Sequence, residues 1–266
     1  MHPIERLRFV ARSQGAPADL LVEEAAGALG AFRDDPAGMV AACRRIIDRQ
    51  LTCAPLWWLC ARILCAPEPM REAHEAVSDL ESDPTARLLA AALPDDGVVT
   101  VVGWPAQIAG ALRRRGDVEV LVVDVEGEAD DAVRQLDRMD VESTAVAARG
   151  AGQAVLSSQV LLLDALAVGP DAALVPSGSF AAAAAAQHAG VAVWVVAGAG
   201  RLLPARMFEA LHGRWIETVD PLDAAEELMP LDLVDRVAGI GGVLDPTAAL
   251  QHTDCPVAPE LFRLAG

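Results

Sequence analysis

The stretch VPSGSFAAAAAAQHAGVAVWVVAG, residues 175–198, decides the fold. Its six consecutive alanines, residues 181–186, predict a helix, because alanine has the most favourable helix propensity. Their small side chains also allow that helix to pack closely on a sheet. Residues 191–198 then form an apolar run, which is typical of a strand buried on both faces. The stretch predicts a helix that covers a buried, parallel sheet.

Short β-branched runs on the N-terminal side extend this pattern and alternate with helical segments. Strands are predicted at 98–103, 118–125, 142–148, 159–166 and 191–198, with a brief extended segment at 171–176. Strands separated by helices form parallel sheets covered on both faces, and right-handed crossovers make such a sheet doubly wound. We therefore expect an α/β fold with a doubly wound, mostly parallel, Rossmann-like sheet.

The first part of the chain has a helical pattern instead. Apolar residues recur at helical spacing at Leu20, Leu21, Ala25, Leu29 and Phe32. The next helix is predicted to begin with Asp35 as its N-cap and Pro36 at its first position. The sequence PDDG, residues 94–97, separates the two patterns. We predict a helical N-terminal domain at 1–93 and a Rossmann-like α/β domain at 94–266.

The charge of the chain argues against nucleic acid and membrane partners. Arginine supplies the whole basic set, since lysine is absent, and 21 basic residues face 38 acidic ones for a net charge of −17. Binding to nucleic acid or to an anionic membrane requires a basic surface. The apolar stretch at 180–200 is rich in alanine and interrupted by Gln187 and His188, so we expect it to be buried in the protein.

The N-terminal sequence and the cysteines indicate a cytoplasmic protein. MHPIERLRFVARSQGAP, residues 1–17, does not have the apolar core of a secretory signal. The odd number of cysteines, five, and the absence of a CxxC pair favour free thiols in a reducing compartment and argue against a metal site. Lysine, asparagine and tyrosine, whose codons are AT-rich, are all absent, which indicates a GC-rich bacterial genome.

Candidate binding residues follow the predicted strands, because ligands of open parallel sheets bind at the carboxyl ends of the strands. These residues, in chain order, are Gly103 and Trp104, Asp124, Glu126 and Gly127, Arg149, Gly150 and Gly152, and Asp164 and Asp171.

The turn Ser177-Gly178-Ser179 adds a helix start to this edge. The unpaired N–H groups of a helix start attract anions, and glycine allows close approach of the backbone. Serine is equally a common N-cap, so a phosphate site and a structural cap both remain open. Neither GxGxxG nor a Walker pattern occurs in the sequence, which argues against a nucleotide cofactor, and we expect no cofactor.

Residues 161–198 resemble the hallmark stretch of the initiation factor 2B alpha/beta/delta family. That family includes methylthioribose-1-phosphate isomerase and ribose-1,5-bisphosphate isomerase. Asp164 falls at the family's acidic position, Gly169-Pro170 near its Asn-Gly turn, and Ser177-Gly178-Ser179 at its Ile-Gly-Thr helix start. The resemblance implies the two-part architecture already expected, and it extends over residues 95–250.

A second match to the family lies at MPLDLVDRVAGIGGVLDP, residues 229–246. The family has Val-Pro, an apolar helix, Thr-Glu and Gly-Val-Leu-x-Pro in this segment. The residues that agree are Pro230, Val234, Gly242, Val243, Leu244 and Pro246. The resemblance therefore implies a helix after Pro230.

Several family positions carry other residues in this chain. The catalytic cysteine of the Thr-His-Cys-Asn-like turn is replaced within VGWPA by Trp104-Pro105, and the phosphate-binding Glu-Thr-Arg-Pro turn reads DVEG, residues 124–127. The family's Asp-Ser is Ala148-Arg149, and its Thr-Glu is Gly239-Ile240. Of the family's catalytic pair, the resemblance carries over only the acidic residue, Asp164.

These replacements favour a non-catalytic assembly or regulatory protein. Aldose-phosphate isomerisation needs two positioned groups that move protons, and the thiol is missing here. The resemblance implies a homodimer formed through the C-terminal domain. We further hypothesise a pocket for a small phosphorylated metabolite, formed by Gly103, Trp104, Arg149 and the residues Ser177, Gly178 and Ser179, near Asp164. The alternative is an isomerase of phosphorylated sugars, which would place a second titrating group opposite Asp164.

Overall fold

The computed structural model describes residues 3–13, 15–104, 106–125 and 127–262. The chain forms two compact units. Unit 1 consists of residues 1–83, 199–219 and 253–266, and unit 2 consists of residues 84–198 and 220–252. The domain boundary expected after residue 93 stays a prediction; the first crossing between the two units falls at residues 83–84, and two later segments return to unit 1.

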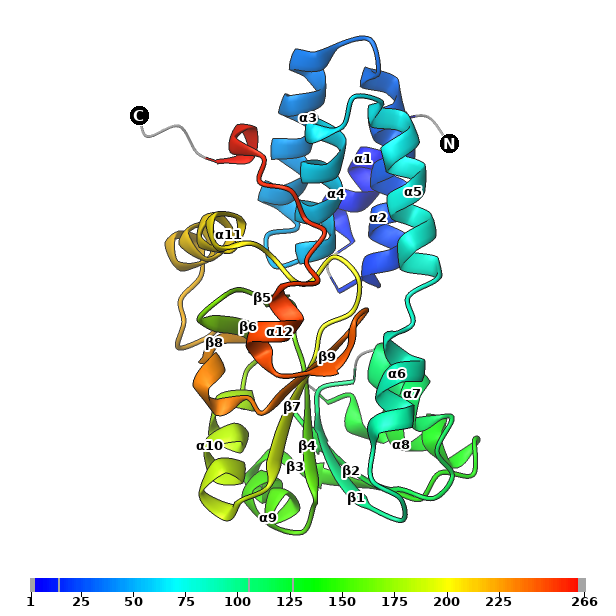
Figure 1. Ribbon diagram of the computed structural model, residues 1–266, viewed down its shortest axis with the longest axis vertical. Helices are drawn as coiled ribbons and strands as arrows, with labels where there is room; N and C mark the ends of the chain where they lie inside the picture. The colour runs from blue at the N-terminus through cyan, green and yellow to red at the C-terminus, as the bar shows by residue number, and fades with distance from the viewer. Residues whose placement is uncertain (1–2, 14, 105, 126, 263–266) are drawn as a thin grey trace. The chain divides into compact units, whose positions relative to one another are not determined.

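Unit 1 is helical, as the sequence predicts for its first part. Its helices are α1 (Pro3–Arg12), α2 (Ala18–Leu29), α3 (Pro36–Arg49), α4 (Ala54–Cys65), α5 (Pro69–Glu81) and α11 (Ala205–Thr218), with 3₁₀ turns η1 (Gly30–Phe32) and η4 (Pro259–Leu261) (Figure 1). The predicted start of α3 is confirmed, since the Asp35 carboxylate accepts a hydrogen bond from the Gly38 N–H at 2.9 Å. This bond satisfies one of the unpaired donors of the first helical turn.

Helix α4 forms the centre of unit 1 and is buried along most of its length. Trp57 and Trp58 are both completely buried. Buried indole N–H groups need acceptors. The Trp57 Nε1 donates to the Leu51 carbonyl at 3.0 Å, and the Trp58 Nε1 donates to the Asp254 carboxylate at 2.9 Å. The tryptophan pair is therefore structural.

Unit 2 contains a seven-stranded sheet in the order β10-β9-β7-β4-β1-β2-β3. Every neighbouring pair is parallel except β10 with β9. The strands are β1 (Val98–Val102), β2 (Glu119–Asp124), β3 (Ser143–Ala147), β4 (Val160–Asp164), β7 (Ala192–Val196), β9 (Arg236–Gly239) and β10 (Gly242–Leu244). The first five of these confirm the strands predicted from apolar runs.

Helices cover the two faces of this sheet (Figure 1). They are α6 (Thr85–Ala92), α7 (Ala106–Leu112), α8 (Ala129–Asp137), α9 (Ala151–Leu156), α10 (Ser179–Ala189) and α12 (Pro246–Leu250). Helix α10 contains the alanine run, and Ala182, Ala183 and Ala186 are its buried alanines. Their methyl groups let the helix lie close to the strands, as the sequence predicts. No helix in the described part of the chain is long and apolar enough to cross a membrane.

A second, three-stranded antiparallel sheet lies in unit 2 in the order β5-β6-β8. Its strands are β5 (Ala167–Val168), β6 (Ala172–Pro176) and β8 (Glu226–Pro230). The extended segment predicted at 171–176 is thus β6. The helix implied after Pro230 is wrong: a single 3₁₀ turn, η3 (Leu231–Leu233), leads directly into β9. The Asp235 carboxylate accepts from the Val193 N–H at 2.8 Å, which fixes an extended path beside β7.

Candidate functional site

The candidate site lies where strand order reverses in the seven-stranded sheet. From β1 the chain continues to β2 and β3 on one side, and it then returns to form β4 on the other side of β1. Ligands of open α/β sheets bind at such a switch point, outside the carboxyl ends of the strands. Gly103 follows β1 and Asp164 ends β4 at this point. The sheet topology therefore places these two residues on neighbouring strands.

Gly103 lies close to the Ser-Gly-Ser turn. Its φ of +77° is in the left-handed region, and a Cβ at this position would lie 3.4 Å from the Pro176 Cγ. Pro176 directly precedes Ser177. The structure therefore brings the end of β1 together with the turn that begins α10, as the sequence predicts for a shared sheet edge.

The polar groups of the turn are largely engaged within unit 2. The Ser177 hydroxyl donates to the Ala224 carbonyl at 2.7 Å, and the Ser177 N–H donates to the Ala225 carbonyl at 2.8 Å. Ser179 is completely buried, and its hydroxyl has no partner among the described residues. Gly178 precedes α10 with a φ of +90°. The turn is therefore fixed by the loop at 224–225.

A carboxylate already occupies the start of α10. Glu227 of β8 lies opposite Val175 of β6, and its Oε1 accepts a hydrogen bond from the Phe180 N–H at 2.8 Å. Carboxylates are favourable at helix N-termini for the same reason as phosphates, because both interact with unpaired N–H groups and the positive end of the helix dipole. A phosphate at this position would have to displace Glu227.

Trp104 and Asp124 both interact with the region of helix α8. The Trp104 indole N–H donates to the Gln135 Oε1 at 3.0 Å, and its partly buried ring packs against the core of unit 2. The Asp124 Oδ1 accepts from the N–H of Gly127 at 2.7 Å and of Ala129 at 3.4 Å. Asp124 thus fixes the turn that leads into α8. Pro105 and Glu126 lie outside the described residues.

Arg149 lies in an exposed 3₁₀ turn, η2 (Ala148–Gly150), which follows β3. Its guanidinium makes no hydrogen bond or ion pair with the described residues. Strand β3 is three strands from β4, so at 4.7–4.9 Å per strand the backbone at Arg149 is roughly 14 Å from the Asp164 position. The structure places Arg149 and Asp164 on the same sheet edge but too far apart to form one site.

Asp164 is half-buried at the end of β4, in register with Val196 of β7. Isomerisation also requires a second proton-moving group. The residues of unit 2 include no cysteine and two histidines. His188 lies in the last turn of α10, at the opposite end of that helix from the turn, and His252 follows α12, beside Gly241. No group of three or more metal-ligating side chains occurs in the described ranges.

The five cysteines all belong to unit 1 and are free thiols. Burial raises the pKa of the Cys53 thiol to about 11 and that of the Cys255 thiol well above its usual range. The neighbouring Cys43 thiol and burial together raise the pKa of Cys60. Thiols with raised pKa values are protonated at neutral pH and are therefore poor nucleophiles.

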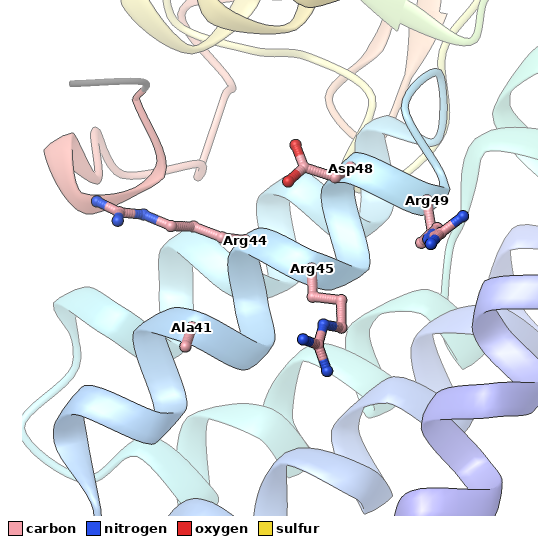
Figure 2. Close-up of a pocket in the computed structure, with 5 residues that line it drawn as sticks. All are labelled: Ala41, Arg44, Arg45, Asp48 and Arg49. Atoms are coloured by element: carbon pink, nitrogen blue, oxygen red, sulfur yellow. The ribbon is translucent and has the colours of Figure 1, made fainter. Parts of the chain in front are cut away.

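Helix α3 carries an open hollow of about 530 Å³ that the sequence pattern did not predict as a site. Figure 2 shows the residues that line it, Ala41, Arg44, Arg45, Asp48 and Arg49, with their charged side chains diverging from one another. The Arg44 Nε donates to the Glu260 carbonyl at 2.6 Å, and Asp48 forms an ion pair with Arg214 at 2.7 Å. Two of the charged residues thus hold unit 1 together. In the sequence, the charged residues of CRRIIDR, residues 43–49, indicate this charged face of the helix.

In sequence, the chain matches no protein-family model and no curated protein. Its structure is similar to that of eIF2B beta from Chaetomium thermophilum, with a TM-score of 0.77, 16% identity, and coverage of 98% of this chain and 93% of that chain. It is also similar to a chain of the tetrameric eIF2B-beta2-delta2 complex from C. thermophilum, with a TM-score of 0.75, 16% identity, and coverage of 92% and 91%.

A third similar structure is an enzyme, 5-methylthioribose 1-phosphate isomerase from Pyrococcus horikoshii OT3. The TM-score is 0.65 at 13% identity, and the match covers 94% of this chain and 86% of that chain. The chain therefore has the fold shared by initiation factor 2B subunits and this isomerase. The fold implied by the sequence resemblance is confirmed. Fold alone does not separate assembly from catalysis, because function resides in the site.

Proposed function

We propose that the protein is a non-catalytic assembly or regulatory protein with the initiation factor 2B fold. The observation that carries the proposal is the Glu227 carboxylate at the start of α10. It takes the position where the helix would otherwise bind the phosphate of a substrate. Trp104 and Asp124 are likewise engaged with the region of α8. The polar groups at the strand ends thus serve mainly to hold unit 2 in shape.

Assembly is the activity that best fits this arrangement. A similar chain occurs in a tetrameric eIF2B-beta2-delta2 complex, which supports self-association. We propose a cytoplasmic homodimer formed through the sheet unit, unit 2. Sedimentation velocity of the purified protein measures this directly, and a monomer at every concentration would contradict the assembly role.

The regulatory ligand we propose is a small phosphorylated metabolite held near Gly103, Trp104 and the turn Ser177-Gly178-Ser179. Its binding requires Glu227 to move away from the Phe180 N–H. The substitution Glu227→Gln keeps an oxygen that can accept this hydrogen bond and removes the negative charge that would repel a phosphate. We therefore expect Glu227→Gln to raise the affinity for sugar phosphates in a thermal-shift panel.

Arg149→Ala is the companion variant for this panel. If Arg149 contributes to the pocket, this variant lowers phosphate binding; if it is only a surface residue, binding is unchanged. A panel in which no phosphate stabilises either the wild-type protein or Glu227→Gln would contradict the metabolite site while leaving the assembly role intact.

Aldose-phosphate isomerase activity is the second candidate function. It is favoured by Asp164 at the switch point and by the similarity to 5-methylthioribose 1-phosphate isomerase. Isomerisation would be detected by NMR of aldose phosphates incubated with the protein. We expect no turnover above that of Asp164→Asn. Turnover in the wild-type protein that Asp164→Asn abolishes would overturn the non-catalytic proposal.

A further inference from the structure

Strand β3 is an edge strand of the seven-stranded sheet. It pairs with β2 in an unbroken parallel register from Ser143 opposite Val120 to Ala147 opposite Asp124. Its other side has no neighbouring strand in the sheet order. An edge strand presents a row of N–H and C=O groups that can pair with another strand.

The register identifies which backbone groups point outward. The Val120 N–H donates to the Glu142 carbonyl, so the backbone groups of Val120 point toward β3. Because these directions alternate along a strand, Thr144 and Val146 direct their N–H and C=O groups toward β2. Ser143, Ala145 and Ala147 therefore direct theirs toward the open side.

Helix α8 packs against β3, but the residues of the strand carry no charge or proline that would prevent pairing. Natural proteins protect edge strands with charged side chains, prolines, bulges or covering elements. Strand β3 reads STAVA, with no charge, no proline and no bulge in its register. Thr144, Ala145 and Ala147 are exposed. The opposite edge strand, β10, is shorter, at three residues against five in β3.

Opposite charges flank the two ends of this neutral strand. Glu142 precedes β3 and Arg149 follows it, and both are exposed and make no ion pair among the described residues. A parallel copy of the strand would place like charges together. An antiparallel copy would bring each Glu142 near the partner's Arg149, so the edge is complementary to itself.

We propose that β3 pairs antiparallel with β3 of a second copy of this chain, so that the two sheets join across a twofold axis. Ala145 then lies opposite the partner's Ala145, and Ser143 lies opposite the partner's Ala147. Isologous pairing of this kind is the closed arrangement of twofold dimers. The inference rests on the proposed homodimer and assigns the surface through which it forms.

Two predictions follow from the small size of this contact and from its charges. One strand pair buries less surface than a standard stable interface, so we expect a dimer with a Kd on the order of micromolar. The contact between Glu142 and the partner's Arg149 is exposed to solvent, so salt weakens the dimer.

Ala145→Pro is the sharpest test of the surface. Proline removes the Ala145 N–H, which points away from β2, and edge strands tolerate proline at such positions. The fold of unit 2 is therefore retained, as circular dichroism checks. Sedimentation equilibrium should show a Kd at least tenfold higher than that of the wild-type protein.

Charge reversal provides a second test that leaves the backbone unchanged. Glu142→Arg and Arg149→Glu alone should each weaken the dimer several-fold, because each places like charges together at both ends of the pair. The double variant Glu142→Arg/Arg149→Glu restores opposite charges and should recover wild-type affinity. This rescue would not occur if the residues merely affected the fold.

The outcomes separate this inference from the proposed function. A wild-type dimer that is unchanged by Ala145→Pro and by both single reversals overturns the β3 surface but leaves the assembly role intact. A wild-type monomer at all concentrations overturns both.

Discussion

The two units join their distant segments by different means. In unit 2, residues 220–252 return through backbone ladders: β8 pairs with β6, and β9 pairs with β7. In unit 1, residues 199–219 and the described part of 253–262 are joined to the first helices by side-chain hydrogen bonds and by the buried face of α11. A ladder distributes its hydrogen bonds over consecutive residues, whereas a side-chain contact concentrates them on one.

Arg214 is the main contact of this kind in unit 1. It is 5% exposed, lies on α11, and forms an ion pair with Asp48 of α3 at 2.7 Å. It also donates to the Leu261 carbonyl and lies over the Trp57 ring at 5.0 Å. One side chain therefore connects α3, α4, α11 and the C-terminal segment.

Arg62 has a similar role at the other end of α4. Its guanidinium forms ion pairs with Glu72, with Asp79 at 2.6 Å and with Asp254 at 3.3 Å, and it lies over the Trp58 ring at 4.7 Å. Asp254 in turn accepts from the Trp58 indole. The difference between the units predicts that unit 1 is the more sensitive to single polar substitutions.

The largest effect is expected for Arg214→Met. The variant leaves the Leu261 carbonyl without this donor and Asp48 without its partner, which should lower the free energy of unfolding by about 3 kcal/mol. Urea unfolding measures this. Arg71→Met, which removes an exposed ion pair with Glu75, is the control and should change stability by less than about 0.5 kcal/mol. Equal effects of both variants would contradict the role of Arg214 as a main contact of unit 1.

A smaller effect is expected from glycine substitutions matched in backbone conformation. Gly200 of unit 1 has a φ of +73°, and a Cβ there would meet Trp58 at 3.0 Å and the backbone of Pro55 at 3.1 Å. Gly190 of unit 2 has a φ of +71° and open space around it. Both alanine variants suffer strain of the left-handed backbone, about 1 kcal/mol. Gly200→Ala should cost about 1 kcal/mol more, because it also overpacks the segment against α4.

Thermal unfolding of the two glycine variants gives this difference. If Gly200→Ala is no less stable than Gly190→Ala, then the contact of the returning segment with α4 is loose, and the contrast between the units is weaker than we infer.

Unit 2 should show only local effects from its polar groups. Asp124→Ala removes the acceptor for the N–H groups of Gly127 and Ala129 and should cost about 1 kcal/mol. Asp124→Asn keeps an acceptor oxygen and should remain within a few tenths of a kcal/mol of the wild-type protein. Hydrogen exchange should locate the loss in α8. Destabilisation spread over the whole sheet would contradict a local role.

The smallest effect is expected from pH. His212 lies between Phe208 and Trp215, with ring centroids 6.2 Å from each, and burial lowers its pKa below the ordinary 6.5. The unfolded chain therefore takes up a proton on His212 before the folded chain does. Stability is fully present above pH 6.5 and falls as the pH drops from 6.5 toward the lowered value.

His212→Phe removes this contribution and should reduce the pH dependence of urea unfolding between pH 7.5 and 5.5. If His212→Phe retains the full pH dependence of the wild-type protein, then other titrating groups cause that dependence.

The central strands of unit 2 were predictable because their apolar runs are local signals. Strand β8, EELMP, and strands β9 and β10, within RVAGIGGVL, carry weaker patterns, and their pairing with β6 and β7 determines their conformation. The shared edge of Gly103, Asp164 and the Ser-Gly-Ser turn was likewise predictable, because all three follow or precede recognisable elements. Glu227 was not predictable as the cap of α10, because β8 brings that side chain from 47 residues away.

The return of distant segments to unit 1 also has a consequence for biosynthesis. Helices α1 to α5 leave the ribosome first, yet the Trp58 indole N–H and the Arg44 Nε have their acceptors at Asp254 and Glu260, near the end of the chain. The helical unit of the nascent chain therefore stays incomplete until nearly the whole sheet unit has been translated. The helices that are synthesised first therefore complete their packing last. Their apolar surface is exposed for the longest time, and we expect a chaperone to bind it.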